Sequence, residues 1–239
     1  MEAVDQHRRD GAARDDDVRR YEGARPVTEH PILFNEPMSA AARAGRKSQT
    51  RRVVRGESLN WLNSANFTPE CVAQRENGFS PYGYDGDRLW VRETHIAYGR
   101  WETRYSAKKE RDEWHFVDMT LETGREYRFD GEVPNAARGG VLPTWWRRPS
   151  IFMPRAAART LLEVTGVRVE RLQNISEPDA RAEGVTIEGH HMRGYCAGAY
   201  RPPSIRAFHD LWDNLNAARG HGWDTDPWVW AVEFRRIGS

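Results

Sequence analysis

The residues best suited to chemistry in this chain lie in a basic run at positions 45–54, Gly-Arg-Lys-Ser-Gln-Thr-Arg-Arg-Val-Val. Lys47 is one of only three lysines in a sequence whose other cationic side chains are nearly all arginine, and Thr50 follows three residues later. An arginine stays protonated and binds anions through a planar fork, whereas a desolvated lysine amine can lose its proton and act as a base. The run could therefore combine anion binding with proton transfer.

The same run has a simpler interpretation. Basic clusters that follow a helix are most often a solvated face or a patch that contacts phosphate, and then Arg46, Arg51 and Arg52 would only bind anions. A regular strand would also point Lys47 and Thr50 to opposite faces, so joint action requires an irregular backbone between them, as occurs just after a helix end. Spacing alone does not decide between the two interpretations.

A second basic segment, residues 143–154, contains Trp145, Trp146 and Arg148 and is interrupted by prolines, which excludes a helix. Aromatic rings and arginine planes stack on unpaired bases, and each such contact contributes about 1–3 kcal/mol. The two tryptophans could equally close a hydrophobic core. The segment is thus a candidate substrate-binding surface, with the structural alternative left open.

Composition narrows the class of partner. The 239 residues are 38% hydrophobic and 30% charged, and the formal net charge is +1. No global field attracts such a chain to nucleic acid, so phosphate binding would depend on local arginine clusters. Two cysteines, Cys71 and Cys196, form no disulfide framework, and no signal-peptide core or 18-residue apolar stretch is found. These features predict a cytoplasmic protein without membrane contact.

A metal centre is not expected. Residues 185–203 form a predicted loop that contains His190, His191 and Cys196. Two adjacent histidines and one cysteine match no strong ligand spacing, and the chain has no glycine-rich phosphate loop. We therefore expect neither a metal ion nor another cofactor.

The basic run lies between a predicted helix and a predicted strand. Ile32 to Phe34 form an apolar run typical of a buried strand, and Asn35 is suited to cap a following helix with Pro37 at an early position. Gly45 is a natural stop for that helix. The residues from Lys47 onward should then be extended.

Downstream, a Gly-Asp turn leads into further elements. Periodicity and capping predict a strand at 88–93, a strand at 161–169, a short acidic helix at 176–183, an amphipathic helix at 204–220 and a last strand at 228–234. Ser176 and Asp179 form a predicted capping box for the acidic helix. Several strands around a few short helices, without a βαβ rhythm, predict an α+β fold with a small mixed β-barrel.

The chain is expected to hold one domain. Residues 1–29 contain little to bury and are predicted to be a disordered or loosely packed leader, so the domain spans 30–239. Its predicted insertions lie near 55–80, where Trp61 and Phe67 would be anchors, near 97–142, where hairpins with loose connections are expected, and near 185–203.

Gly45, Lys47, Thr50 and Arg52 form a Gly-x-Lys-x-x-Thr-x-Arg pattern that resembles the signature of ASCH domains, which belong to the PUA-like β-barrels. The predicted order of elements over residues 30–237 is similar to theirs. The chain also resembles larger ASCH proteins of phages and prophages, with Arg-Lys-x-Gln-Thr-Arg-Arg, Gly-Asp-Arg-Leu-Trp-Val-Arg-Glu and Asp-Pro-Trp-Val-Trp segments. Several ordered motifs therefore support the resemblance.

The resemblance implies an activity. Small bacterial ASCH proteins with a similar signature are amidohydrolases that remove acyl groups from the exocyclic amine of N4-acylated cytidine with a lysine, a threonine and a glutamate. By motif these roles fall on Lys47, Thr50 and Glu183. A neutral lysine amine could take the threonine proton during attack on the acyl carbonyl, and the glutamate could pass a proton to the departing amine. Burial and neighbouring arginines would lower the pKa of Lys47 in the required direction.

The resemblance also implies a competing role. Many PUA-like domains bind RNA without altering it, and some ASCH proteins have been regarded as RNA binders or nucleases. The partner would then be single-stranded RNA or a modified base, with Lys47, Arg51 and Arg52 on phosphate, and its binding would fall steeply with salt. A structural protein of a phage particle is a third alternative. Arg88, Trp90 and Arg92 are candidates for a pocket wall, although structural roles are the favoured interpretation for them.

Overall fold

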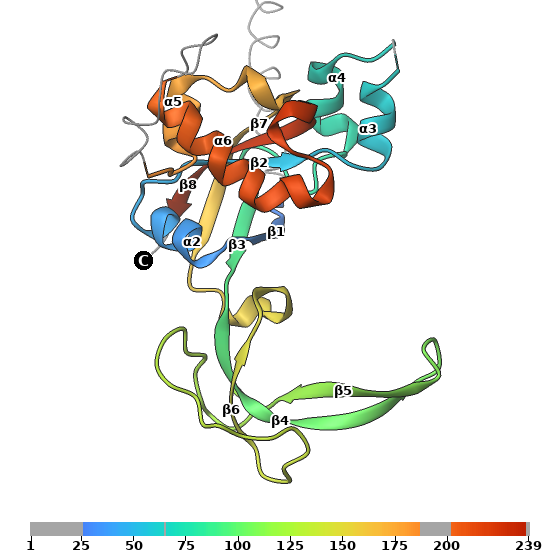
Figure 1. Ribbon diagram of the computed structural model, residues 1–239, viewed down its shortest axis with the longest axis vertical. Coiled ribbons are helices and arrows are strands. Elements are labelled where there is room, and N and C mark those ends of the chain that lie inside the picture. The colour runs from blue at the N-terminus through green and yellow to red at the C-terminus, as the bar shows by residue number, and fades with distance from the viewer. Residues whose placement is uncertain (1–25, 65, 187–201, 238–239) are drawn as a thin grey trace, which may run out of the picture.

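The computed structural model describes residues 26–64, 66–186 and 202–237, which form eight strands in two sheets with short helices around them (Figure 1). The strands are β1 (Glu29–Leu33), β2 (Gln49–Val53), β3 (Arg88–Arg92), β4 (His95–Ser106), β5 (Arg111–Asp118), β6 (Thr144–Arg148), β7 (Leu161–Arg171) and β8 (Trp228–Ile237). The α-helices are α2 (Glu36–Arg43), α3 (Glu57–Leu62), α4 (Pro69–Ala73), α5 (Glu177–Ala182) and α6 (Pro203–Asn216). This confirms the predicted α+β class.

The first sheet has the strand order β1-β3-β7-β8-β2. The β1–β3 pair is parallel and the other pairs are antiparallel. In the described residues the sheet is open rather than closed into the predicted small barrel, with β1 and β2 at its two edges. The guanidinium of Arg52 in β2 donates to the Leu33 carbonyl in β1 at 2.9 Å. A side chain therefore bridges the two edges where a barrel would have a strand ladder.

The core of the first sheet follows from the alternation in β7 and β8. Leu162 and Val164 on β7, and Val232 and Phe234 on β8, are almost completely buried. Apolar residues at every second position lie on one face of a strand, so pairing along the two strands produces one continuous apolar layer. A second cluster forms where α6 packs Phe208 and Trp212 against other buried residues, namely Leu172, Ile175, Ala180, Trp223 and Val229.

The helix ends next to the basic run have the predicted chemistry. Asn35 caps α2, because its side chain accepts a hydrogen bond from the Met38 amide at 2.9 Å. Gly45 has a φ of +71° and follows the end of the helix. The predicted capping box of α5 is present, with Ser176 and Asp179 as its members, and the helix ends just before Glu183.

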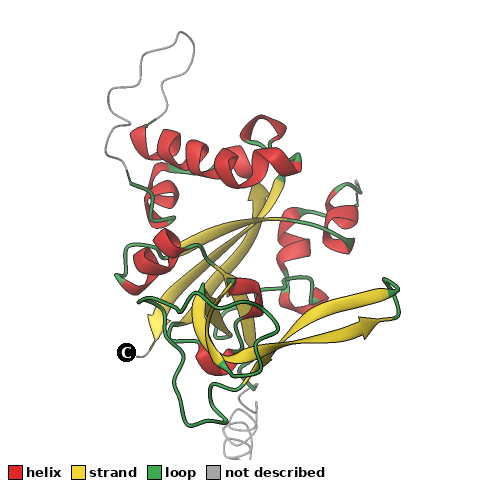
Figure 2. Cartoon of the chain, turned by 60° about the horizontal axis from the view of Figure 1, so that its bottom comes forward, coloured by secondary structure: helices red, strands yellow, loops and turns green. Residues whose placement is uncertain are grey.

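The second sheet has the order β5-β4-β6 and is formed by the predicted insertion and the segment that follows it. The long β4–β5 hairpin projects from the rest of the molecule (Figure 2). The prediction of a hairpin is thus confirmed, and residues 144–148 join it as a third strand. The other predicted insertion, near 55–80, contains two short helices, and its anchors Trp61 and Phe67 stack with their ring centroids 4.0 Å apart.

Several predictions fall on residues that the structure does not describe. Most of the expected leader and most of the 185–203 loop, including His190, His191 and Cys196, lie outside the described ranges. Among the helices that are described, none combines the length and apolar character needed to span a bilayer.

Candidate active site

Lys47 lies in the link between α2 and β2, where main-chain hydrogen bonds fix its position. The amides of Arg46 and Lys47 donate to the Ala41 carbonyl at 2.9 and 3.2 Å, and the Ser48 amide donates to Ala182 at the end of α5 at 2.8 Å. Because Lys47 precedes the first residue of β2, the alternation of a regular strand does not govern the direction of its side chain.

Glu183 reaches Lys47 because the turn after α5 approaches the link closely. Gly184 has a φ of +77°, and a Cβ at this position would lie 2.9 Å from the Lys47 Cβ, so only glycine fits. The Lys47 Nζ donates to Glu183 Oε2 at 2.7 Å, to the Glu183 carbonyl at 2.9 Å and to the Gln49 carbonyl at 2.8 Å. All three hydrogens of the ammonium group therefore have an acceptor.

The Lys47–Glu183 pair is almost completely buried, which changes the protonation equilibrium of the lysine. Lys47 is 2% exposed and Glu183 is 3% exposed. Burial lowers the pKa of the Lys47 ammonium, the Glu183 carboxylate opposes that shift, and the charges of Arg52 and Arg51 lower the pKa further. The net direction is downward, so the neutral amine is easier to reach than in an exposed lysine.

Arg51 holds the other oxygen of Glu183. Its side chain is fully buried and lies 3.4 Å from Glu183 Oε1, and it also binds Glu170 at 3.0 Å, Asp179 at 3.2 Å and the Gln49 side chain at 2.6 Å. Its guanidinium is thus occupied by protein acceptors. Arg51 therefore links Glu183 to Glu170 and Asp179, while Lys47 binds the other oxygen of Glu183.

Thr50 and Arg52 lie on the same face of β2, opposite to the face that carries Gln49 and Arg51. Thr50 is fully buried, and its hydroxyl accepts a hydrogen bond from the Arg52 guanidinium at 2.6 Å. The Arg52 guanidinium and the Lys47 ammonium each lie 5.5 Å from the centroid of the Phe34 ring. The lysine and the arginine that binds Thr50 therefore lie at one aromatic side chain just after β1, whereas the described hydrogen bonds of Lys47 go to Gln49 and Glu183 and not to Thr50.

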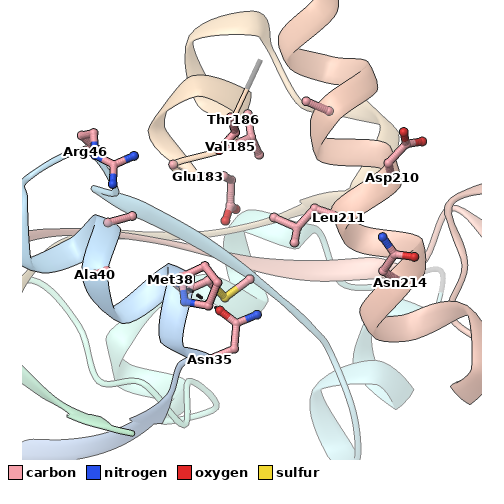
Figure 3. A pocket seen from close by; sticks show the side chains of 14 residues that line it. Asn35, Met38, Ala40, Arg46, Glu183, Val185, Thr186, Asp210, Leu211 and Asn214 are labelled. Carbon is pink, nitrogen blue, oxygen red and sulfur yellow. Dashed lines mark hydrogen bonds between the residues drawn. The ribbon is translucent and has the colours of Figure 1, made fainter. Parts of the chain in front are cut away.

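Two cavities meet at this group, and Asn35, Met38, Glu183 and Leu211 line both of them. One has a volume of about 550 Å³ and lies between α2 and α6, with the Glu183 carboxylate pointing into the space between the two helices (Figure 3). The other has a volume of about 630 Å³ and lies between the edges of the first sheet and the C-terminal half of α6. Both volumes are in the range of small-molecule sites.

The two cavities differ in their linings. We call the first the alanine lobe, because it is lined by Ala40, Ala41 and Ala207 together with other residues that include Pro37, Val185, Arg46 and Asp210. We call the second the arginine lobe, because its lining includes Arg52, Arg55, Arg92 and Arg219, with Phe34 and Tyr82 among its aromatic residues. Neither Lys47 nor Thr50 lines a lobe, so Glu183 is the member of the predicted triad that a ligand meets first.

The predicted substrate-binding residues are divided between distant places. Arg46 is exposed and lines the alanine lobe, and Arg51 and Arg52 lie at the arginine lobe. Trp145, Trp146 and Arg148 lie on β6 in the second sheet, where their described partners are groups of that sheet and its loops: the Trp146 indole donates to the Gly99 carbonyl at 3.0 Å, and Trp145 meets the Tyr98 ring edge-on. These three residues line neither lobe.

Sequence reasoning missed most of the arginine lobe. Arg55 follows β2, Arg92 ends β3 and Arg219 follows α6, so three distant segments contribute one guanidinium each. Arg92 was named as a pocket candidate with a structural role favoured, and the structure gives it both roles, because its side chain also donates to the Ile151 carbonyl. The position of Arg219 just after the amphipathic helix could be read from the sequence. Periodicity could not predict that this position lies at the same cavity as β2.

No cluster of three or more histidine, cysteine, aspartate or glutamate side chains with the geometry of a metal site occurs in the part of the chain that the structure describes. Cys71 is a partly buried free thiol.

Comparison with known proteins finds structural neighbours but no matching family model or curated protein. The ASCH domain from Lactobacillus crispatus JV V101 is structurally similar with 9% sequence identity and a TM-score of 0.36, over 87% of this chain and 79% of that chain. An Enterococcus faecalis V583 protein of the DUF984 family model is similar with 8% identity and a TM-score of 0.36, over 95% of this chain and 90% of that chain. An ASCH domain is thus among the structural neighbours.

Proposed function

We propose that this protein is a metal-independent amidohydrolase that removes acyl groups from N4-acylated cytosine compounds. The observation that carries the proposal is the buried Lys47–Glu183 pair, 2.7 Å apart, at the junction of two cavities of small-molecule size. Buried pairs whose protonation is shifted by desolvation are typical of acid–base catalysis. The choice of substrate rests on the resemblance of the residue 45–52 motif to the ASCH signature.

The proposed reaction begins with transfer of a proton from the Lys47 ammonium to the Glu183 carboxylate, which gives a neutral amine and a carboxylic acid. Lys47 then takes the proton of the Thr50 hydroxyl while Thr50 Oγ forms a bond to the acyl carbon. The carbon–nitrogen bond breaks as Glu183 donates its proton to the exocyclic N4. The products are the free cytosine compound, an acyl-threonine and the original ion pair.

Water completes the cycle by the same route. A second proton transfer within the pair restores the neutral amine, which takes a proton from water as its oxygen attacks the acyl-threonine carbon. Thr50 Oγ leaves and receives the proton held by Glu183. The attack requires Arg52 to withdraw from Thr50, because the hydroxyl is fully buried and bound to that guanidinium.

Hydrolysis of N4-acetylcytidine after treatment with a chelator tests the proposal. We expect turnover by the wild type, and a decrease in kcat of about 10²–10⁴-fold in Lys47→Ala and Glu183→Gln. Thr50→Val removes the hydroxyl at nearly constant volume and should be similarly inactive, whereas Thr50→Ser should keep measurable turnover. Arg104→Gln, on the exposed hairpin, is the matched control.

Circular dichroism identifies any variant that fails to fold. If Lys47→Ala, Thr50→Val and Glu183→Gln are folded and keep full turnover, the proposed mechanism is wrong. If the wild type hydrolyses no N4-acylated cytosine compound, the proposed function is wrong.

A second candidate function is non-catalytic binding of RNA or of a modified base. The arginine lobe favours it, because guanidinium groups and aromatic side chains together suit unpaired nucleotides. On this alternative, titration of a single-stranded oligonucleotide should show that the logarithm of the binding constant falls linearly with the logarithm of the salt concentration. Absence of any salt-sensitive binding would remove this candidate.

A further inference from the structure

We infer that the arginine lobe binds the phosphate of a nucleotide, so that the substrate is a phosphorylated N4-acylcytidine rather than the free nucleoside. The inference rests on the proposed function and names its substrate class. It is carried by the convergence of four guanidinium groups on one cavity without matching carboxylates.

The lobe brings together several arginines that have no carboxylate partner. Elsewhere arginines are held in two ways: Arg43 and Arg159 bind Glu93, Arg155 binds Glu29 and Arg235 binds Glu163, whereas Arg125, Arg138 and Arg148 lie over aromatic rings. Five arginines line the lobe, and Arg51 is paired with carboxylates. Within the described residues, no carboxylate forms an ion pair with the other four, which are Arg52, Arg55, Arg92 and Arg219.

The one carboxylate that lines the lobe forms no ion pair with these four arginines. Glu183 gives one oxygen to Lys47 and approaches Arg51 with the other. Both of its oxygens are therefore bound to cations that do not belong to the four, and its charge acts on Arg52 only through space. Like charges that converge on a cavity of about 630 Å³ favour an anionic occupant.

The protein compensates only part of this positive charge. Arg52 donates to the carbonyls of Arg51 and Leu33, and Arg92 donates to the carbonyl of Ile151. The C-terminal end of α6 adds a partial negative charge of about half an electron. These contacts orient the guanidinium groups of Arg52 and Arg92. In the described structure, most of the positive charge of the four arginines still has no counterion.

Phosphate fits this environment better than other common anions of nucleotide chemistry. Guanidinium groups bind phosphate oxygens through paired hydrogen bonds, and several arginines can share its three terminal oxygens. Tyr82 also lines the lobe. Burial raises the pKa of the Tyr82 phenol, against the charges of Arg52 and Arg55, so the hydroxyl stays protonated at neutral pH and can donate to the same anion. The arrangement places the phosphate on one side of Glu183 and leaves the alanine lobe, on the other side, to the acyl group.

The test compares N4-acetylcytidine with N4-acetylcytidine 5′-monophosphate as substrates of the wild-type chain. We expect kcat/KM to be at least about tenfold higher for the nucleotide, because a charge-assisted contact to phosphate typically contributes a factor of ten or more. In Arg55→Gln and Arg219→Gln the ratio of the two kcat/KM values should fall toward one. Arg104→Gln, on the exposed hairpin, should keep the wild-type ratio.

The outcomes separate this inference from the proposed function. Equal kcat/KM values for the two substrates in the wild type would overturn the inference and leave the amidohydrolase intact. If neither compound is hydrolysed, the proposed function fails, and calorimetric titration with cytidine and cytidine 5′-monophosphate still tests the lobe. Tighter binding of the monophosphate that is lost in Arg55→Gln supports the inference, and equal binding overturns it.

A nucleic-acid strand would offer the same phosphate chemistry. A short single-stranded oligonucleotide with one internal N4-acetylcytidine distinguishes this source. A kcat/KM for the oligonucleotide at or below that of the monophosphate supports the mononucleotide, whereas a value a further tenfold higher assigns the lobe to a strand backbone and overturns it.

Discussion

Buried arginines are held in two different ways in the two sheets. At the arginine lobe, Arg51 binds the carboxylates of Glu170, Asp179 and Glu183. In the second sheet, Arg148 lies over the rings of three aromatic residues, with its guanidinium carbon 4.6, 4.4 and 4.7 Å from the centroids of Trp101, Phe116 and Phe152. Among the described residues, Arg148 forms no ion pair.

The two environments constrain the position of an arginine side chain to different degrees. Hydrogen bonds to carboxylates are directional and neutralise charge, so the Arg51 network fixes the oxygen atoms of Glu183 in place. An aromatic face attracts a cation over a broad area and fixes no single atom. The same arrangement recurs through the second sheet and its loops, with Arg125 over Tyr98, Arg138 over Trp101 and Arg128 over Trp145. Ion pairs thus fix the carboxylate oxygens of the candidate active site, whereas Arg148 and the similar arginines near the second sheet are held by contacts that tolerate displacement.

Replacing Arg51 should give the largest loss of stability. Arg51→Met keeps the length of the side chain but leaves three carboxylates without their shared cation, and breaking a buried ion pair costs about 3–5 kcal/mol. We expect the free energy of unfolding, measured by urea denaturation, to fall by that amount. Arg181→Met is the matched control, because Arg181 forms an exposed pair with Glu177 and should change stability by about 0.5 kcal/mol or less. A loss below about 1 kcal/mol in Arg51→Met would show that the network is not structural.

Replacing Arg148 should have a smaller effect. Arg148→Met removes the cation from three rings and keeps most of the packing of the side-chain stem, so we expect a loss of about 2 kcal/mol in the free energy of unfolding. No carboxylate loses an ion-pair partner in this variant, which is the reason for the difference from Arg51→Met. If the two substitutions cost the same, the distinction between the two regions is wrong.

Local chemistry made the elements around the site predictable. The cap at Asn35, the stop at Gly45 and the capping box at Ser176 each depend on residues within a few positions of one another, and the structure has all three. The alternating strands and the amphipathic helix were predictable for the same reason. The pairing of Lys47 with Glu183, 136 positions apart, came only from the family resemblance.

The remaining features depend on contacts between distant segments. The parallel β1–β3 pair and the open edges of the first sheet are decided by tertiary packing, which periodicity does not record. The arginine lobe draws its guanidinium groups from segments far apart in the sequence. The basic-aromatic segment at 143–154 is predicted either to stack on unpaired bases or to close a core. In the structure the described aromatic and arginine contacts of Trp145, Trp146 and Arg148 are with groups of their own sheet and its neighbouring loops.

His95 tests how well the second sheet tolerates a buried charge. It is a titratable group buried in that sheet, and it forms no ion pair among the described residues. Burial lowers its pKa, and Arg148 and Arg92 add to that shift, while the Glu93 carbonyl and Asp118 oppose it. Below pH 6.5 the unfolded chain therefore binds a proton that the folded chain resists, so stability falls on acidification. Urea denaturation across pH 5–7 should show this slope, weaker in His95→Asn and unchanged in His115→Asn on the exposed hairpin face. Equal slopes in all three proteins would mean that protonation of His95 does not destabilise the fold. The second sheet would then accommodate a buried charge as well as the carboxylate network around Arg51 does.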